Sequence, residues 1–181
     1  MPFEIEKLDI ADVLYIKAKK FADDRGFFAE LYKEDIFKQA GIPDIKQINF
    51  SKSVKGVLRG LHFQLPPFAQ GKVVRAVKGE IFDVAVDLRN DSATFGRWVG
   101  KRLVEDEFNM LYIPEGFAHG FEVLSAEAEF EYFCTQSYAP QYERGILYND
   151  PSINISWSTK NPIVSPKDAK NPPFSKTQKY F

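Results

Sequence analysis

The chain of 181 residues contains only two histidines, His62 and His119, and each lies within an apolar segment typical of a strand. A histidine in that setting is often an ordinary core residue satisfied by a hydrogen bond. A pair of them also fits acid–base chemistry, because imidazole has the unperturbed pKa closest to neutrality. Such chemistry requires a carboxylate that orients the ring. Spacing alone leaves three candidates open, namely Asp83, Asp87 and Asp168.

Asp168 also has a local interpretation that involves no chemistry. The segment Ser165-Pro166-Lys167-Asp168 has the pattern of a helix start, with serine as N-cap, proline at the first position and an acid in the first turn. Local sequence alone therefore favours a capping role for Asp168.

Cationic and phenolic side chains near the histidines could contact an anionic substrate. Arg59 and Lys72 flank His62 across a predicted hairpin, although such residues are more often surface charges. Strict alternation places Arg59 and His62 on opposite faces, so both reach one pocket only if a bulge, for which Gly60 is the candidate, makes the strand irregular. Tyr132 is a core residue on the local pattern, or a general acid if its hydroxyl faces a polar pocket.

The residue pattern does not favour a metal or redox centre. No third histidine accompanies the pair, and the single cysteine, Cys134, forms neither a disulfide within the chain nor a CxxC motif. No glycine-rich dinucleotide fingerprint is present. We therefore expect a reaction that needs no cofactor and no metal.

Composition restricts the partners. Lys plus Arg (24) nearly balances Asp plus Glu (25), which gives a net charge of −1 and no large basic field for nucleic acid. The N-terminal segment lacks the apolar stretch of a signal peptide, and no apolar run has transmembrane length. We expect a cytoplasmic protein that binds neither nucleic acid nor membrane.

The elements that must position these residues are predicted to be strands. Aromatic residues make up 15% of the chain, turn signals recur at short intervals, and no repeat of 20 to 50 residues occurs. Helical signal is confined to Lys33–Ala40, with Gly41 as a C-cap, and to a short turn after Ser165. The expected strands are Gly26–Leu31, Lys46–Ser51, Val57–Gln64, Lys72–Val77, Ile81–Leu88, Trp98–Leu103, Met110–Ile113, Phe117–Leu124 and Phe130–Thr135.

Many antiparallel strands with few helices predict an all-β jelly roll or a closed barrel, either of which can hold a ligand in its interior. Alternation is clearest in Ile81–Leu88, where Phe82, Val84, Val86 and Leu88 share one face while Asp83 and Asp87 share the other. We expect one domain over residues 1–181. The Pro- and Lys-rich stretch from 161 to 181 is predicted to be an extended C-terminal arm.

Six ordered blocks of the sequence closely resemble the dTDP-4-dehydrorhamnose 3,5-epimerases, the cupin-type enzymes of dTDP-L-rhamnose synthesis. The blocks cover most of the chain, which makes the resemblance specific. They are DRGFFAE (24–30), KGVLRGLHFQ (55–64), AQGKVVRAVKGEIFDVAVDLR (69–89), TFGRWVG (94–100), IPEGFAHGF (113–121) and YAPQYERGI with NDP (138–151).

The resemblance implies a cupin-like jelly roll (double-stranded β-helix) that epimerises C3 and C5 of dTDP-4-dehydro-6-deoxy-D-glucose. His62 would then be the general base. Asp168 would orient its ring, which replaces the capping role that the local sequence favours for Asp168. Lys72 would stabilise the enolate oxygen, and Tyr132 would protonate the opposite face. The positions that would hold the nucleotide-sugar are Arg25, Glu30, Gln47, Asn49, Arg59, Lys72, His119, Glu143 and Lys167, with Tyr138 stacking on thymine.

The resemblance also implies a homodimer with exchanged N-terminal strands, in which Arg25 enters the site of the neighbouring subunit. The chain departs from the family at Ile48, Phe50, Glu131 and Phe133, which by alternation face away from the pocket. The alternatives are a related cupin that epimerises one carbon or moves the ketone, a non-catalytic nucleotide-sugar-binding module, and a metal-dependent cupin.

Overall fold

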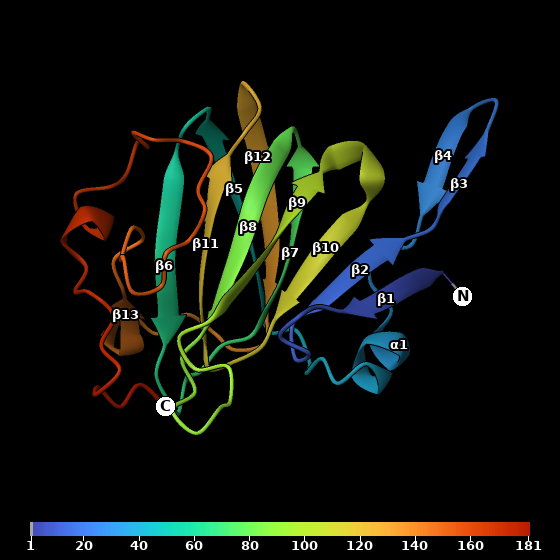
Figure 1. The fold of residues 1–181 in the computed structure, drawn as a ribbon. Coiled ribbons are helices and arrows are strands. Elements are labelled where there is room, and N and C mark those ends of the chain that lie inside the picture. The colour runs from blue at the N-terminus through green and yellow to red at the C-terminus, as the bar shows by residue number, and fades with distance from the viewer. Residues whose placement is uncertain (1) are drawn as a thin grey trace.

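The computed structural model describes residues 2–181, which form two antiparallel sheets that face each other (Figure 1). The six-stranded sheet has the order β1 (Phe3–Lys7), β2 (Leu14–Ala18), β10 (Asn109–Ile113), β7 (Lys72–Lys78), β12 (Glu127–Cys134) and β5 (Gln47–Val54). The five-stranded sheet has the order β13 (Glu143–Gly145), β6 (Leu58–Gln64), β11 (Phe117–Val123), β8 (Glu80–Asp87) and β9 (Trp98–Val104). This arrangement confirms the predicted all-β jelly roll with few short helices.

Helical structure is limited to short segments. The one α-helix among the described residues is α1 (Glu34–Gln39), and Gly41 follows it with φ +84°, as expected of a glycine after a helix end. Three single 3-10 turns are η1 (Glu105–Glu107), η2 (Pro140–Tyr142) and η3 (Asp168–Lys170). The predicted helix and the predicted turn after Ser165 are thus confirmed.

Every predicted strand has a counterpart, but four observed strands were not predicted. These are β1, β2, β3 (Lys20–Asp23) and β13. Only Phe3 of β1 is buried, and all of β3 is exposed, so neither strand shows the alternation that marks a half-buried sheet. In β2, by contrast, Leu14, Ile16 and Ala18 alternate with more exposed residues, a signal that could have been found.

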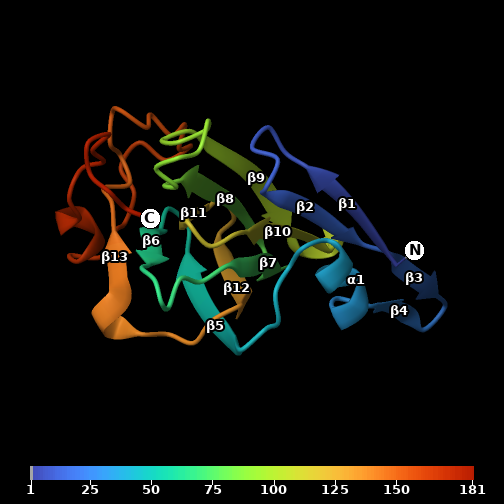
Figure 2. The same ribbon diagram turned by 90° about the horizontal axis from the view of Figure 1, so that it is seen from below.

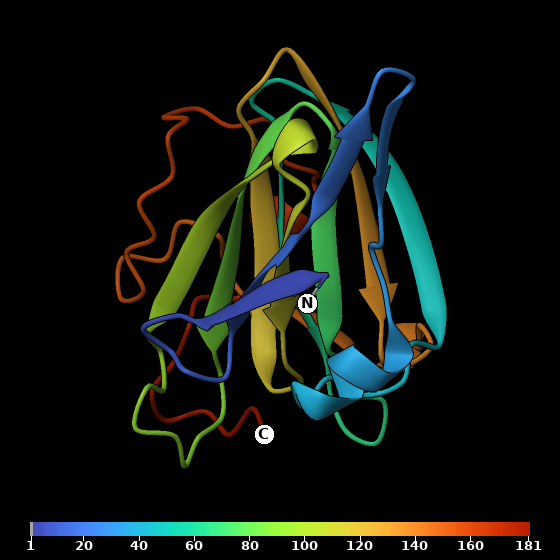
Figure 3. The same cartoon turned by 90° about the vertical axis from the view of Figure 1, so that its right-hand side faces the viewer.

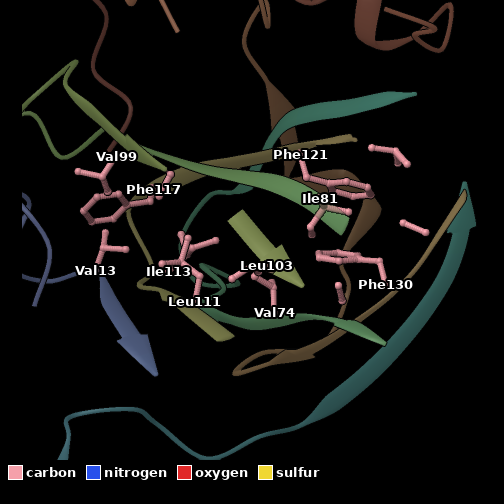
Figure 4. Close-up of a cluster of buried hydrophobic side chains, with 14 of the residues drawn as sticks. Val13, Val74, Ile81, Val99, Leu103, Leu111, Ile113, Phe117, Phe121 and Phe130 are labelled. Atoms are coloured by element: carbon pink, nitrogen blue, oxygen red, sulfur yellow. The ribbon is translucent and has the colours of Figure 1, made fainter. Parts of the chain in front are cut away.

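The main core lies between the two sheets and is built by the alternating inward residues of both (Figure 4). Leu111 and Val74 approach it from the six-stranded sheet, while Ile81 approaches it from the five-stranded sheet. Phe121 and Phe130 stack at 4.3 Å between ring centroids. Because the two sheets are hydrophobic on their facing sides, this layer holds them at a fixed separation.

Two further apolar layers cover the outer faces of the sheets. Helix α1 lies against the outer face of the six-stranded sheet (Figure 3). Its Phe37 is buried there in one cluster with Phe3 of β1, Leu14 of β2 and Tyr112 of β10. The chain from 146 to 181 packs along the outside of β6, β8 and β11, where Phe174 and Tyr180 are buried with Val84 and Val86 (Figure 2). The outward face of β8 is therefore covered by the C-terminal segment, which positions residues 163–168 beside β6.

The hairpin of β3 and β4 (Gly26–Ala29) projects from the body, at the upper right of Figure 1, and forms a separate two-stranded sheet. Its aromatic side chains are exposed, with Phe28 at 64% and Phe27 at 54% of full exposure. An apolar hairpin of this kind is unusual on a monomer surface. None of the helices within residues 2–181 has the length and apolar character needed to cross a membrane.

Candidate active site

A cavity of about 650 Å³ opens between the two sheets, next to β5 and β6. Residues of β5, β6, β7, β11, β12 and β13 line it, together with the C-terminal segment 163–168. Among the residues singled out from the sequence, the structure brings these into the one cavity: Gln47, Asn49, Arg59, His62, Lys72, His119, Tyr132, Tyr138, Glu143, Lys167 and Asp168. Arg25 and Glu30 do not line the cavity of their own chain.

His62 and Asp168 form the first histidine–carboxylate pair of the site. His62 Nε2 lies 2.7 Å from Asp168 Oδ1, and the Gly60 amide donates to Asp168 Oδ2 at 3.2 Å. Burial raises the pKa of Asp168, but the hydrogen bonds from His62 and Gly60 outweigh it and hold the pKa below its usual value. The ionised carboxylate therefore orients the imidazole ring.

The capping interpretation of this segment is half correct. The Asp168 amide donates to Ser165 Oγ at 3.0 Å, so Ser165 does cap the turn that leads into η3. The Asp168 side chain, however, is buried and points to His62 instead of supporting its own turn. A contact between residues 106 positions apart leaves no trace in local sequence.

An irregularity in β6 places Arg59 and His62 on the same cavity. In the pairing of β6 with β11, Arg59 lies opposite Phe121 and His62 lies opposite His119, so one strand advances three residues while the other advances two. Gly60 sits within this bulge with φ +131°. The predicted bulge at Gly60 is confirmed.

His119 forms a second pair of the same type, directly across the sheet from His62. Its Nε2 lies 2.8 Å from Asp83 Oδ2, and Asp83 has no exposed surface. Burial raises the pKa of Asp83 and lowers the pKa of His119. The third candidate, Asp87, serves a different purpose, since it pairs with Arg89 at 2.7 Å.

Lys72 and Tyr132 enter the cavity from the six-stranded sheet, and both histidines enter it from the five-stranded sheet. Burial lowers the pKa of Lys72 and raises the pKa of Tyr132. Tyr132 therefore stays protonated at neutral pH. The cavity thus has an oriented imidazole on one wall, and a phenol and an amine on the other.

The mouth of the cavity is polar and held by a network of hydrogen bonds. Gln47 Nε2 donates to Asn49 Oδ1 at 2.9 Å, and the Tyr138 amide donates to Gln47 Oε1 at 2.8 Å. Glu143 accepts from the Tyr138 hydroxyl at 2.9 Å and pairs with Lys167. Burial raises the pKa of Glu143, but the hydrogen bonds from Lys167 and Tyr138 bring it below its ordinary value.

The four residues that depart from the resembled family lie outside the cavity, as predicted. Ile48 and Phe50 are each 58% exposed on the outer face of β5. Glu131 accepts from Arg75 at 2.8 Å, and Phe133 packs towards the outer core under α1.

Sequence reasoning missed part of the cavity wall. Phe121 and Phe130 form an apolar floor, which alternation assigns to the interior but cannot distinguish from core. Ile163 and Val164 come from irregular chain that is joined to the sheets by a single bridge between Ile163 and Val57, so no periodic signal marks them. Within residues 2–181, no group of three or more His, Cys, Asp or Glu side chains is arranged to hold a metal ion.

Comparison with known proteins agrees with this geometry. The family model described as dTDP-4-dehydrorhamnose 3,5-epimerase matches residues 7–176. The chain is 54% identical over 170 residues to the dTDP-4-dehydrorhamnose 3,5-epimerase of Shigella flexneri, covering 93% of this chain and 94% of that protein. It is also 42% identical over 166 residues to a dTDP-4-dehydrorhamnose 3-epimerase of Streptomyces niveus, covering 91% of this chain and 80% of the relative.

A crystal structure of dTDP-6-deoxy-D-glucose-3,5-epimerase from Legionella pneumophila, in complex with dTDP-4-keto-L-rhamnose, superposes with a TM-score of 0.91. The two chains are 45% identical, and the match covers 94% of this chain and 92% of that one. The chain belongs to the dTDP-4-dehydrorhamnose 3,5-epimerase family and is an isomerase.

Proposed function

We propose that the protein epimerises C3 and C5 of dTDP-4-dehydro-6-deoxy-D-glucose through an enolate, with His62 as the general base and Tyr132 as the general acid. The observation that carries the assignment is their placement on opposite walls of one cavity, His62 on β6 and Tyr132 on β12. Inversion needs this arrangement, because the proton must leave one face of the carbon and return to the other.

The chemistry of each step fits the residue that performs it. A hydrogen on C3 or C5 is acidic because the carbon lies next to the C4 ketone, and His62 takes it as a proton while the C–H electron pair moves into the enolate. Lys72 stabilises the negative charge on the ketone oxygen. The Tyr132 hydroxyl then gives its proton to the opposite face of the same carbon. Asp168 keeps the ring of His62 in place and stabilises the imidazolium.

The mouth of the cavity supplies groups suited to a nucleotide diphosphate. Arg59 and Lys167 offer positive charge, and Tyr138 is 52% exposed, which leaves its ring free to stack on thymine. Gln47, Asn49, His119 and Glu143 add hydrogen-bonding groups. Binding energy from these contacts, remote from the reacting carbons, holds the ring in place for both inversions.

The functional unit in this proposal is a homodimer with shared sites. Arg25 and Glu30 lie at the β3–β4 hairpin, away from their own cavity, and the hairpin exposes Phe21, Phe27 and Phe28. Insertion of this hairpin beside a partner's cavity would bury these rings and deliver Arg25 and Glu30 to the substrate. The enzyme would act in the cytoplasm, with each site built from two chains.

No metal or redox cofactor is needed for this reaction, because the substrate's own ketone provides the electron sink and the carbon's oxidation state does not change. Exhaustive chelation should therefore leave the rate unchanged. A loss of activity that added metal restores would instead establish a metal-dependent cupin.

The first test is hydrogen exchange in D₂O. The purified protein is incubated with dTDP-4-keto-6-deoxy-D-glucose, and deuterium at C3 and C5 is followed by NMR while a 4-keto reductase traps the product. Deuterium at both carbons with formation of dTDP-L-rhamnose is the expected result. The absence of exchange despite tight binding would contradict catalysis and leave a binding protein.

One alternative has a specific observation in its favour. The Streptomyces niveus relative is a 3-epimerase at 42% identity, so a similar chain carries out a single inversion. Deuterium at C3 alone would assign this protein to that activity. A ketone found at C3 in the product would instead indicate a ketoisomerase.

A further inference from the structure

Asp83 is a buried carboxylate beside the cavity that the mechanism above does not use. It lies on β8 among inward-facing apolar residues, with no exposed surface. Its Oδ2 contacts His119 Nε2 at 2.8 Å, while its Oδ1 is buried and accepts a hydrogen bond from none of the described residues. Burying a carboxylate with one oxygen unpartnered costs free energy, so its presence calls for a role beyond packing.

Lys72 and Asp83 belong to the same interior cluster but come from opposite sheets. Lys72 on β7 lines the cavity, and Asp83 on β8 contacts His119, which lines the same cavity. The titratable groups around Lys72 come from four strands, namely Asp83 on β8, His119 on β11, Cys134 on β12 and Glu143 on β13. Burial raises the pKa of the Cys134 thiol, so the thiol carries no negative charge at neutral pH. The imidazole of His119 is neutral or cationic and supplies none either. The carboxylate of Glu143 is already paired with Lys167.

We propose that Asp83 is a positioning residue for the epimerisation, which keeps Lys72 protonated inside the cavity and fixes the tautomer of His119. The inference rests on the proposed role of Lys72 beside the developing enolate.

Both effects follow from the charge of one carboxylate. Burial raises the pKa of Asp83, whereas the contact with His119 and the charge of Lys72 lower it, and the proposal requires that these two keep the carboxylate ionised. An ionised carboxylate only accepts hydrogen bonds, so Nε2 of His119 then carries the proton and Nδ1 presents its lone pair as an acceptor. Burial lowers the pKa of Lys72, and the negative charge of Asp83 raises it again. An uncharged amine could not stabilise the enolate oxygen, so the carboxylate acts on the reaction through Lys72.

The test is Asp83→Asn, which removes the charge with almost no change in volume. Loss of the charge lets Lys72 deprotonate at lower pH, so the basic limb of the kcat/KM profile is expected to move to lower pH by about one unit. A changed tautomer of His119 would lower kcat/KM by the same factor at all pH values and would not move the basic limb of the profile. The two effects of Asp83 can therefore be told apart. Tyr132 does not account for a limb at lower pH, because burial raises the pKa of its hydroxyl.

Asp87→Asn is the matched control. Asp87 is also fully buried on β8, but its carboxylate binds Arg89, Ser92 and Thr94 instead of facing the cavity. Its substitution is expected to lower stability and leave the basic limb in place. A shift of the basic limb by the same amount in both variants would overturn the proposal. The shift would then follow from loss of a buried carboxylate on β8 in general and not from loss of the charge of Asp83.

Two measurements by NMR are independent of turnover. The Lys72 amine is titrated in ¹⁵N-lysine-labelled protein, with its signal assigned by its loss in Lys72→Met, and a lower midpoint is expected in Asp83→Asn. An unchanged midpoint would overturn the proposal even if the protein epimerises its substrate. Should Asp83→Asn fail to fold, the ¹³C carboxyl signal of Asp83 in the unmodified protein decides. An ionised group at pH 7 supports the role, and a protonated one overturns it.

Discussion

At the residue scale, the site contains two histidines with the same partner type and different surroundings. His62 lies at the cavity with 30% of its side chain exposed, whereas the side chain of His119 is only 8% exposed. The more accessible ring can reach substrate and exchange its proton, while the more enclosed ring is held in one protonation state. Residue type alone cannot assign the base, and the surroundings favour His62.

His62→Asn is expected to lower kcat by about 10²–10⁴-fold, because a positioned general base contributes that much to proton abstraction. Binding of dTDP measured by calorimetry is expected to change little, since the nucleotide groups at the mouth remain. Thermal unfolding serves as the control for folding. Retention of normal turnover in a folded variant would remove His62 from the role of base.

At the element scale, the bulge in β6 is the feature that brings the site residues of this strand together. It turns both Arg59 and His62 towards one cavity, and it depends on the close approach of two backbones. A Cβ on Gly60 would lie 2.6 Å from Gly120 Cα and 2.9 Å from the His119 carbonyl oxygen. The approach of β6 to β11 at this point therefore has no room for a side chain.

Gly60→Ala is expected to destabilise the protein by at least about 3 kcal/mol, from the positive φ and from the collision with Gly120. Gly26→Ala is the matched control, since Gly26 has φ +134° but no atom within 4 Å of an added Cβ. The control should lose only the backbone contribution, about 1–3 kcal/mol. Urea unfolding measures the free energy of unfolding of both variants. An equal loss in the two would show that the collision with Gly120 does not contribute to the destabilisation.

At the scale of the whole molecule, the exposed hairpin of β3 and β4 is the feature on which the proposed homodimer rests. Phe28 is 64% exposed, and Phe27 contacts the body of its own chain through an edge-to-face pair with Phe108. In the proposed homodimer, a second copy of the chain covers this surface. The proposed sharing of Arg25 makes a prediction that activity can test.

Subunits of Arg25→Ala and of His62→Asn, each inactive alone, are expected to regain activity when mixed and re-formed as dimers. If Arg25 acts on the partner's cavity, each mixed dimer holds one site with both defects and one site with neither. Random mixing at equal amounts then restores about a quarter of the normal activity. Light scattering tests whether the mixed sample is dimeric, and no recovery of activity in such mixed dimers would place Arg25 in its own chain's site.

The sequence by itself determined the fold class and most of the membership of the site. Alternation separated the two faces of Ile81–Leu88 and of Phe130–Thr135, because the side-chain period of a strand is a local property. It did not say which face of Ile81–Leu88 is inward, since the apolar face with Val84 and Val86 turns outward under the C-terminal segment. The glycine in β6 marked the irregular strand for a similarly local reason. The ordered motifs identified the family before any contact was known.

The residue pattern left open which carboxylate serves which histidine. The family resemblance implied Asp168 for His62, and only the tertiary structure paired Asp83 with His119. Asp168 reaches His62 from 106 positions away, and Asp83 reaches His119 from 36 positions away, in each case through pairing of distant strands or packing of irregular chain. Local sequence favoured a cap for Asp168, because a turn and a long-range partner can use the same residue. Contacts of this kind depend on how the two sheets and the C-terminal segment pack against each other. The periodicity of the sequence does not encode that packing.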